Sequence, residues 1–254
     1  MTCLMCPQLG VMFDAGPPLH GQMKYDTVLV SHGHQDHLGG LPYLVSQRKM
    51  HKDTPLTVHA PEEIEAPLRS IFAAWSQIED FELEVDLHGH APGSSVKIGK
   101  QYVAHAIRSV HRVPSLAWLV ERVTRRLRPE FAERPGEELK RLRDEGAPIT
   151  EEHREPVLCV TGDTQIELFA EEPRVRQARV LVHEVTGWDD RRDVAAVRKW
   201  GHTHVDEMIA QCERFEGEAL VLVHRSARHS RAQALQVVAE RFPESVRERV
   251  HVFG

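Results

Sequence analysis

The chain has 254 residues, 41% of them hydrophobic, which is enough to bury a sizeable core as one domain. A formal net charge of -6 argues against a surface built for nonspecific nucleic-acid binding, although it leaves room for a local basic groove. The sequence has no apolar run of eighteen residues and no basic, apolar leader, so we expect a cytoplasmic protein with neither a spanning helix nor a secretory signal.

The four cysteines agree with that compartment. Cys159 and Cys212 lie in apolar stretches, and Cys3-x-x-Cys6 has no second pair that would complete a structural zinc site. We expect reduced thiols near a strand; a redox or metal role for the Cys3 and Cys6 pair is the lesser alternative.

The first third of the chain alternates apolar strand patterns with helical patterns, which is the βαβ rhythm. The spacing predicts a strand and turn over 9–16, strands over 25–30 and 55–59, and helices over 37–50 and 61–79. Alternating residues then predict half-exposed antiparallel strands over 81–87, 95–98 and 102–107, followed by a strand over 115–120.

A charged segment over about 121–156 interrupts this pattern and reads as an insertion into a single domain of residues 1–254. Residues 136–145 within it predict a short solvated helix of mixed charge. The βα rhythm then returns, with strands over 157–161, 180–184, 219–224 and 249–253 and helices over 190–200, 205–215 and 231–242. The fold class is therefore α/β, and two half-sheets with outer helices are consistent with a four-layer αββα sandwich.

The densest chemical signal follows the strand over 25–30, where His32, His34, Asp36 and His37 fall within six positions. Imidazole and carboxylate are ligands that zinc prefers, and four on one loop exceed what a single tetrahedral ion takes from one direction. The motif therefore predicts two metal ions. The other histidines, including His59 and His90, have no partner motif and are expected at the surface or in loops.

His32-x-His34-x-Asp36-His37 followed by Gly-Gly resembles the signature of the metallo-β-lactamase-fold hydrolases. The resemblance implies that His111, in a turn between two strands, joins His32 and His34 on one metal. It implies that Asp36, His37 and His224 hold the second metal and that Asp163, in Thr161-Gly-Asp-Thr164, bridges the two. Relatives of this fold usually begin with another strand or two before a matching Phe-Asp-x-Gly, so we expect an edge strand to be absent or supplied differently.

Two further segments resemble ribonuclease Z. Val182-His-Glu-Val-Thr186 and Gly201-His-Thr203 resemble its His-Glu-Ala-Thr and His-Ser-Thr segments, and His224-x-Ser226-x-Arg228 resembles its last motif. The resemblance implies that Glu184 orients His202, which gives a proton to the leaving oxygen, and Asp36 is grouped with them as a catalytic residue. His204 is the rival donor, and His183 is expected to be only a strand-end neighbour.

Ser226 and Arg228 each have two interpretations. Ser226 could simply cap the helix that begins near Arg231, and Arg228 could be part of a solvated surface. Alternatively, both could contact the substrate, with Arg228 binding a phosphate through its planar guanidinium. The implied enzyme is a metal-dependent phosphodiester hydrolase with two Zn²⁺, or Mn²⁺, acting on RNA in the manner of a tRNA 3′-end endonuclease. A phosphodiesterase for small substrates such as cyclic nucleotides is the alternative, and a lactonase or thioesterase of the same fold is a weaker one. The family also implies a homodimer.

The resemblance weakens over residues 119–156. Ribonuclease Z enzymes carry there an arm rich in Gly, Pro and basic residues that clamps tRNA, whereas this segment holds nine Lys or Arg and ten Asp or Glu. Because a phosphate clamp should be basic, we expect a different kind of insertion, with the cluster from Arg122 to Arg128 as its remaining candidate for RNA contact.

Overall fold

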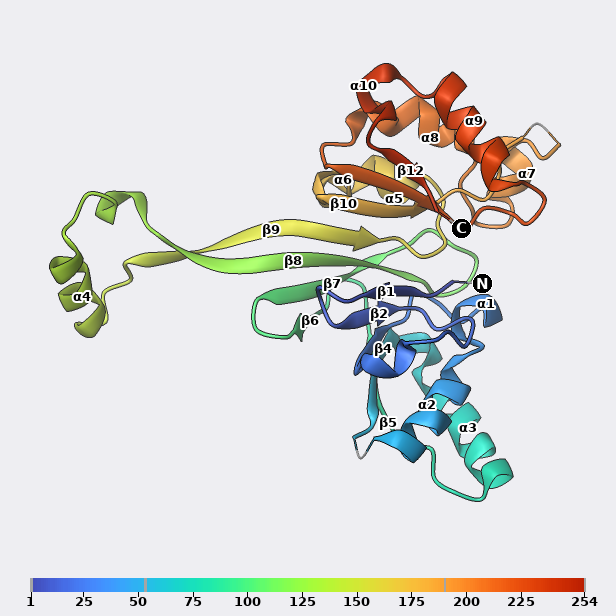
Figure 1. Cartoon of the computed structure of the whole chain (residues 1–254), viewed down its shortest axis with the longest axis horizontal. Coiled ribbons are helices and arrows are strands. Elements are labelled where there is room, and N and C mark those ends of the chain that lie inside the picture. The colour runs from blue at the N-terminus through green and yellow to red at the C-terminus, as the bar shows by residue number, and fades with distance from the viewer. Residues whose placement is uncertain (1, 53, 190, 254) are drawn as a thin grey trace.

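The computed structural model describes residues 2–52, 54–189 and 191–253. Within them the strands form a five-stranded and a seven-stranded sheet that pack together, with helices on the outer faces (Figure 1). The predicted fold class, an αββα sandwich with mixed sheets, is confirmed.

The first sheet has the order β1-β2-β3-β4-β5. Its strands are β1 (Leu4–Cys6), β2 (Val11–Phe13), β3 (Thr27–Leu29), β4 (Leu56–Pro61) and β5 (Val85–His90). Only β1 runs antiparallel to its neighbour in this sheet. The accompanying helices are η1 (Gln22–Lys24), α1 (Gln35–Leu38), α2 (Leu41–His51) and α3 (Glu62–Glu79).

The second sheet has the order β12-β11-β10-β9-β8-β7-β6, antiparallel from β6 to β9 and parallel from β9 to β12. Its strands are β6 (Ser95–Ile98), β7 (Tyr102–Arg108), β8 (Leu116–Leu127), β9 (Thr150–Val160), β10 (Val180–Glu184), β11 (Ala219–Val223) and β12 (Val250–Val252). The body helices on this side are α5 (Glu167–Glu171), α6 (Pro173–Gln177), α7 (Val194–Arg198), α8 (Val205–Gln211), η3 (Cys212–Arg214), α9 (Arg231–Arg241) and α10 (Glu244–Arg247).

Apolar side chains fill each of the three interfaces between these layers. Leu44 and Phe72 belong to the cluster between the first sheet and its helices, and Met208 belongs to the one beneath the helices of the second sheet. Phe13 and Trp118 belong to the cluster between the sheets, where Trp118 Nε1 also donates to the Val30 carbonyl at 2.9 Å. Each fully buried side chain of this size contributes about 1.5–3 kcal/mol, so this packing holds the two sheets in register.

Three elements differ from the sequence predictions. The strand predicted over 81–87 is β5, which starts at Val85 and pairs in parallel with β4 in the first sheet, because α3 returns the chain to the same end. The helix predicted over 37–50 is divided at Gly39 and Gly40, where the Ala15 carbonyl accepts from Gly40 N at 2.8 Å. The helix predicted over 190–200 is only α7, and its predicted first residue, Asp190, lies outside the described residues.

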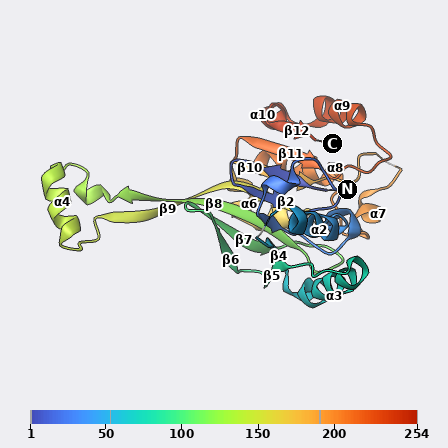
Figure 2. The same cartoon turned by 60° about the horizontal axis from the view of Figure 1, so that its bottom comes forward.

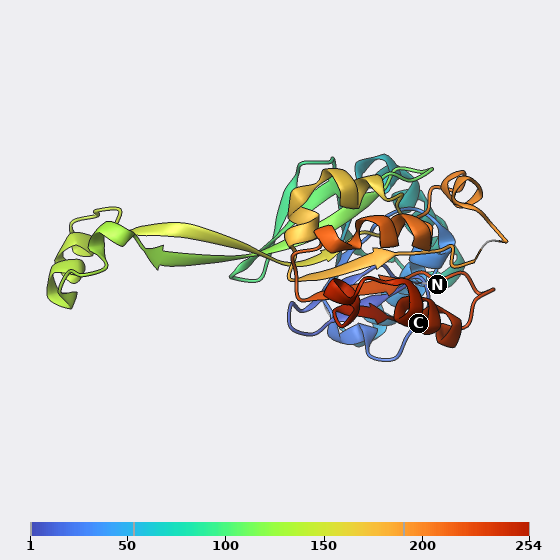
Figure 3. The ribbon, with the colours of Figure 1, turned by 90° about the horizontal axis from the view of Figure 1, so that it is seen from above.

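The charged segment forms a projecting arm, which is the main departure from the prediction. Strands β8 and β9 do not end at the sheet but continue as a two-stranded ribbon, capped by η2 (Pro129–Phe131) and the predicted helix, α4 (Gly136–Asp144) (Figures 1 and 2). The view from above shows the same ribbon standing clear of the body (Figure 3). A register shift between Val120 and Glu121 marks the point where packing ends. Beyond it, cross-strand ion pairs such as Arg122 with Glu155 replace apolar contacts, which is why the sequence there lacks a strand pattern.

The cysteines are as expected from the sequence. All four are free thiols; Cys159 and Cys212 are buried, while Cys3 and Cys6 are half-buried beside and within β1. Burial raises the pKa of both N-terminal thiols. In the described parts of the chain, no helix is both long and apolar enough to cross a bilayer.

His59 is a correction to the expectation that unassigned histidines lie at the surface. It lies on β4 with only 6% of its surface exposed, and its Nδ1 is 2.9 Å from His90 Nε2. Burial, with the neighbouring His90 and His88, lowers the pKa of His59 to about 4. A histidine whose folded pKa lies below its unfolded pKa costs stability as the pH falls from the unfolded value towards the folded one.

The free energy of unfolding should therefore fall between pH 7 and pH 5, because His59 takes up a proton when the protein unfolds. We expect this fall to be about 2 kcal/mol smaller in His59→Gln, which has no such proton to take up. Urea unfolding at the two pH values measures the difference. His51→Gln, at an exposed histidine of α2, serves as the control and should leave the loss unchanged. Equal losses in the wild type and the His59 variant would contradict this prediction.

Candidate functional site

The seven predicted metal ligands lie together at one edge of the two sheets. They come from the segment between β3 and the end of α1, the loop between β7 and β8, and the segments that follow β9 and β11. They are His32, His34, Asp36, His37, His111, Asp163 and His224. Three of these segments follow β3, β9 and β11, which each have a parallel neighbour, and parallel strands present their following loops to one edge of a sheet. His111 instead follows β7, which is antiparallel to β8.

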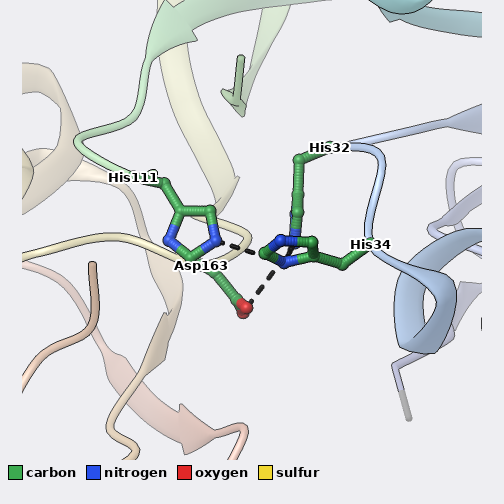
Figure 4. A group of neighbouring side chains, drawn as sticks. All are labelled: His32, His34, His111 and Asp163. Atoms are coloured by element: carbon green, nitrogen blue, oxygen red, sulfur yellow. Dashed lines mark hydrogen bonds and ion pairs between the residues drawn. The ribbon is translucent and has the colours of Figure 1, made fainter. Parts of the chain in front are cut away.

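The first group contains the side chains of His32, His34, His111 and Asp163, whose donor atoms point at one another (Figure 4). His34 Nδ1 lies 3.0 Å from His32 Nε2 and 3.3 Å from His111 Nε2. Asp163 Oδ2 is 3.6 Å from His32 Nε2. Ligands about 2.0–2.1 Å from a tetrahedral ion are themselves about 3.3 Å apart, so the spacing of these atoms suits zinc.

The second group contains Asp36, His37 and His224, and the two histidines of this group lie close to the other oxygen of Asp163. Asp36 Oδ2 lies 3.7 Å from His37 Nε2 and 3.3 Å from His224 Nε2. Asp163 Oδ1 is 3.4 Å from each of the same two nitrogens. Asp163 therefore faces one group with each carboxylate oxygen.

Outer contacts fix the tautomer of four of these rings. His37 Nδ1 donates to Asp14 at 2.7 Å, and His111 Nδ1 donates to the Gly201 carbonyl at 2.8 Å. The Ser31 hydroxyl donates to Asp14 and so accepts from His32 Nδ1, while the Thr186 hydroxyl donates to Glu184 and so accepts from His224 Nδ1. Each ring therefore turns its Nε2 towards its group, and this is the nitrogen that a metal ion would bind.

Asp163 supplies an independent test of whether these residues fit a metal. Its side chain is 3% exposed, and among the described residues its Oδ1 has no hydrogen-bond partner. A buried carboxylate oxygen without a partner is costly. Against the effect of burial, His37 and His224 hold the pKa of the Asp163 carboxyl well below its usual range, so the oxygen carries charge that a cation would offset. The residues present fit a divalent metal.

The pKa values of His32 and His37 show how burial and the nearby carboxylates act on the ligands. Burial, reinforced by the neighbouring ring of His37, lowers the pKa of His32 to about 2, so its ring stays neutral and free to bind. Burial also opposes charge on His37, but Asp14 and Asp163 outweigh it and raise the pKa of His37 to about 10. The carboxylates therefore favour a positive charge at His37 Nε2, whether a proton or a metal ion supplies it.

Glu184 and His202 meet as the sequence predicted. Glu184 is fully buried, and its Oε1 accepts from His202 Nδ1 at 2.9 Å and from the backbone amides of Thr164 and Thr203. Burial opposes charging of the His202 ring, but the adjacent Glu184 carboxylate more than offsets this and raises the pKa of His202. Asp163, His202 and His224 could also form a third ligand group, yet the His202 nitrogen nearest Asp163 is the one already bonded to Glu184.

The rival donor, His204, lies outside the site. It is 1% exposed and caps α8, where its Nδ1 accepts from the amide of Asp206 and its Nε2 lies 3.3 Å from the Asp189 carbonyl. His183 is buried with its Nδ1 on the Glu184 carbonyl, which agrees with a strand-end role.

Ser226 lines two cavities, and Arg228 lines the one that His202 also lines. A cavity of about 410 Å³ is lined by Asp163, His224 and Ser226, and a second of about 300 Å³ is lined by His202, Ser226 and Arg228. The helix cap considered for Ser226 is instead made by Ser230, whose hydroxyl accepts from Gln233 N. The interpretation of Ser226 as a cap is therefore wrong.

Sequence reasoning missed Asp14 as a functional residue and assigned it only to a strand end. Asp14 holds both Ser31 and His37, and it does so from a left-handed backbone conformation with φ of 58°. The signal was present, because Phe13-Asp-Ala-Gly16 matches the Phe-Asp-x-Gly pattern of the resembled fold. Gly16 is needed for the same approach, since a Cβ there would lie 1.8 Å from the Asp36 carbonyl oxygen.

Residues 10–132 match a family described as the beta-lactamase superfamily domain. The fold and the paired His and Asp groups define the chain as a metal-dependent hydrolase of this superfamily. The tRNase Z TRZ1 of Arabidopsis thaliana is 33% identical over 231 residues, covering 90% of this chain and 82% of that protein. The chain therefore belongs to the tRNase Z family, whose members are also named ribonuclease Z.

Two further comparisons agree with this family. The chloroplastic tRNase Z TRZ2 of Arabidopsis thaliana is 26% identical, covering 90% of this chain and 65% of that protein. The crystal structure of human tRNase Z, short form, matches with a TM-score of 0.61 and 18% identity, covering 99% of this chain and 88% of that chain. At this identity the structural match shows the shared fold.

We expect Asp14→Asn to weaken metal binding at the His37 side roughly 10- to 100-fold, because it removes the charge that holds the His37 ring while keeping the side-chain shape. Asparagine also tolerates the left-handed backbone at this position. Titration against a chelator of known affinity measures the effect. Asp86→Asn, at an exposed carboxylate of β5, is the matched control, and unchanged affinity in the Asp14 variant would show that the contact is dispensable.

Proposed function

We propose that this chain hydrolyses phosphodiester bonds in RNA, as a tRNA 3′-end-type endonuclease, at a site built for two metal ions. The observation that carries the proposal is the His202 ring, held by buried Glu184 at 2.9 Å and set directly beside Asp163 and His224. A general hydrolase of this fold needs the ligands alone, whereas an ester of a poor leaving group also needs a proton donor. The names of the curated relatives, tRNase Z and ribonuclease Z, support RNA as the substrate.

For the metals we propose two Zn²⁺, or Mn²⁺, since the ligands are nitrogen and oxygen atoms without sulfur. His32, His34 and His111 would hold one, Asp36, His37 and His224 the other, and Asp163 both. When bound, such a pair supplies an acidified water and positive charge for the phosphate oxygens.

The remaining chemistry belongs to the chain. Glu184 keeps the proton of His202 on Nδ1 and raises the pKa of the ring, so that Nε2 can carry a proton to the leaving oxygen. Two backbone amides and the Thr186 hydroxyl hold Glu184, so it acts as a positioning residue. Asp36, whose carboxyl pKa is held low by His224, stays ionised at the other end of the site.

Arg228 and Ser226 are the proposed substrate contacts outside the metal groups. Arg228 is exposed at the cavity that His202 lines, which favours its interpretation as a phosphate contact through a planar guanidinium, with Ser226 beside it. A homodimer and a cytoplasmic location remain predictions from the sequence and its family resemblance.

Metal analysis of a fully loaded sample should give two ions per chain. Asp163→Ala should lower this number and cost more activity than loss of any outer residue, because both groups depend on that carboxylate. Thr186→Val, which removes only an outer contact, provides the comparison. One ion or none in the loaded wild type would refute the two-metal proposal.

The proton donor gives the sharpest test of the function. Wild-type protein should cleave precursor tRNA, and His202→Ala should lower that turnover by about two to four orders of magnitude, because an alkoxide leaves poorly without a proton. The same variant should lose far less on bis(p-nitrophenyl) phosphate, whose leaving group needs no proton. Glu184→Gln should show a weaker form of the same pattern.

Parallel assays on precursor tRNA, cyclic nucleotides and the nitrophenyl ester separate the alternatives. Turnover of cyclic nucleotides without RNA cleavage would replace the proposal with a small-molecule phosphodiesterase. Equal damage to both leaving groups in His202→Ala, or loss of metal, would make His202 a ligand or a structural residue.

A further inference from the structure

An exposed aromatic ring lies next to the site. Trp200 is 52% exposed, and the guanidinium of Arg112 stacks over its ring at 4.6 Å from the centroid. An indole ring left half in solvent loses the free energy of burial that large aromatic side chains normally provide. Arg112 covers one face, so a flat partner can stack on what remains exposed.

Arg112 and Trp200 are each close in sequence to a residue of the candidate site. Arg112 directly follows His111, and Trp200 is separated from His202 only by Gly201. The Gly201 carbonyl accepts from His111 Nδ1, and Gly201 has a φ of 81°. A Cβ at Gly201 would lie 2.7 Å from His111 Nδ1 and 3.0 Å from Arg112 N, so the two loops touch backbone to backbone. Trp200 therefore has a fixed position relative to His111 and His202.

Trp200 and His202 also line one cavity, of about 300 Å³. The same cavity is lined by Arg191, Arg192 and Arg228, of which Arg191 is paired with Asp189 at 2.5 Å. An aromatic ring among guanidinium groups is the combination that single-stranded nucleic acid uses, with bases stacked on rings and phosphates on the cations. The arginines thus favour an anionic ligand, and the exposed Trp200 ring favours a flat one, so the cavity suits a nucleotide better than an apolar peptide.

We propose that Trp200 is the stacking platform for one nucleobase of the RNA, on the side of the scissile phosphate whose oxygen leaves with a proton. The side follows from His202, since the group it protonates must lie in the cavity that His202 shares with Trp200. This inference rests on the proposed function and names the base-binding part of that site.

The test combines a protein change with a substrate change. Trp200→Ala should raise KM for the RNA about tenfold or more while kcat changes less, because a stacked base contributes to binding before and during reaction. Replacing single nucleotides by abasic ones along the RNA should produce the same loss at one position next to the cleavage site. The two losses should not add when the variant meets that abasic RNA, which is the mark of a direct contact.

Trp200→Phe should restore most of the affinity, because a phenyl ring still offers a flat face on which a base can stack. Trp75→Ala, at a tryptophan of α3 that is 42% exposed and far from the site in sequence, is the matched control and should bind RNA as the wild type does.

Binding read by stopped-flow fluorescence anisotropy before turnover separates this inference from the proposed function. RNA bound through Trp200 but not cut would support the platform and refute the nuclease. RNA cut with the same KM by wild type and Trp200→Ala, or losses that add at every abasic position, would overturn the platform and leave the nuclease standing. Failure to bind RNA at all would overturn both.

Discussion

The carboxylate of Asp163 is the contact on which the rest of the site depends. It follows β9 in the second sheet, yet its oxygens face His32 and His37 from the first sheet. Neither half of the sandwich holds all the ligands proposed for either metal ion, so these two ligand sets exist only when the two sheets pack in the observed register. The apolar layer between the sheets, with Phe13 and Trp118 in it, is therefore as much a condition of the chemistry as the ligands are.

Around this carboxylate, polar contacts decide which atom each ring presents. Asp14 acts twice, on His37 directly and on His32 through Ser31. Glu184 likewise holds His202 directly and His224 through Thr186. Asp14 thus holds rings that come from the first sheet, and Glu184 holds rings that come from the second. Each of these two carboxylates also accepts a hydrogen bond from a backbone amide, which keeps it from turning towards the ligand groups.

The sequence identified His32, His34, Asp36 and His37 from their local spacing, because four metal-binding side chains lie within six positions. His111, Asp163 and His224 each follow a strand, but only the family resemblance implied that they are ligands. Glu184 and His202 were likewise implied by the resemblance to ribonuclease Z. Asp14 was not identified, since a lone carboxylate after a strand looks the same whether it faces solvent or an imidazole. The direction of β5 and the length of β8 also escaped prediction, because strand pairing is set by tertiary contacts and the ribbon beyond Glu121 has no face to bury.

The two strands that continue into the ribbon have their other ends next to the site. Strand β8 starts five residues after His111, and β9 ends three residues before Asp163. An extended strand rises about 3.3 Å per residue, so the twelve residues of β8 span about 36–40 Å from its start near the ligands to its far end, beyond which η2 and α4 form the tip. The length of the arm is therefore set by the number of hydrogen-bonded residue pairs between β8 and β9. Adding or removing one pair moves the tip by a single fixed increment, whatever side chains it carries, so its span and its charge can change independently.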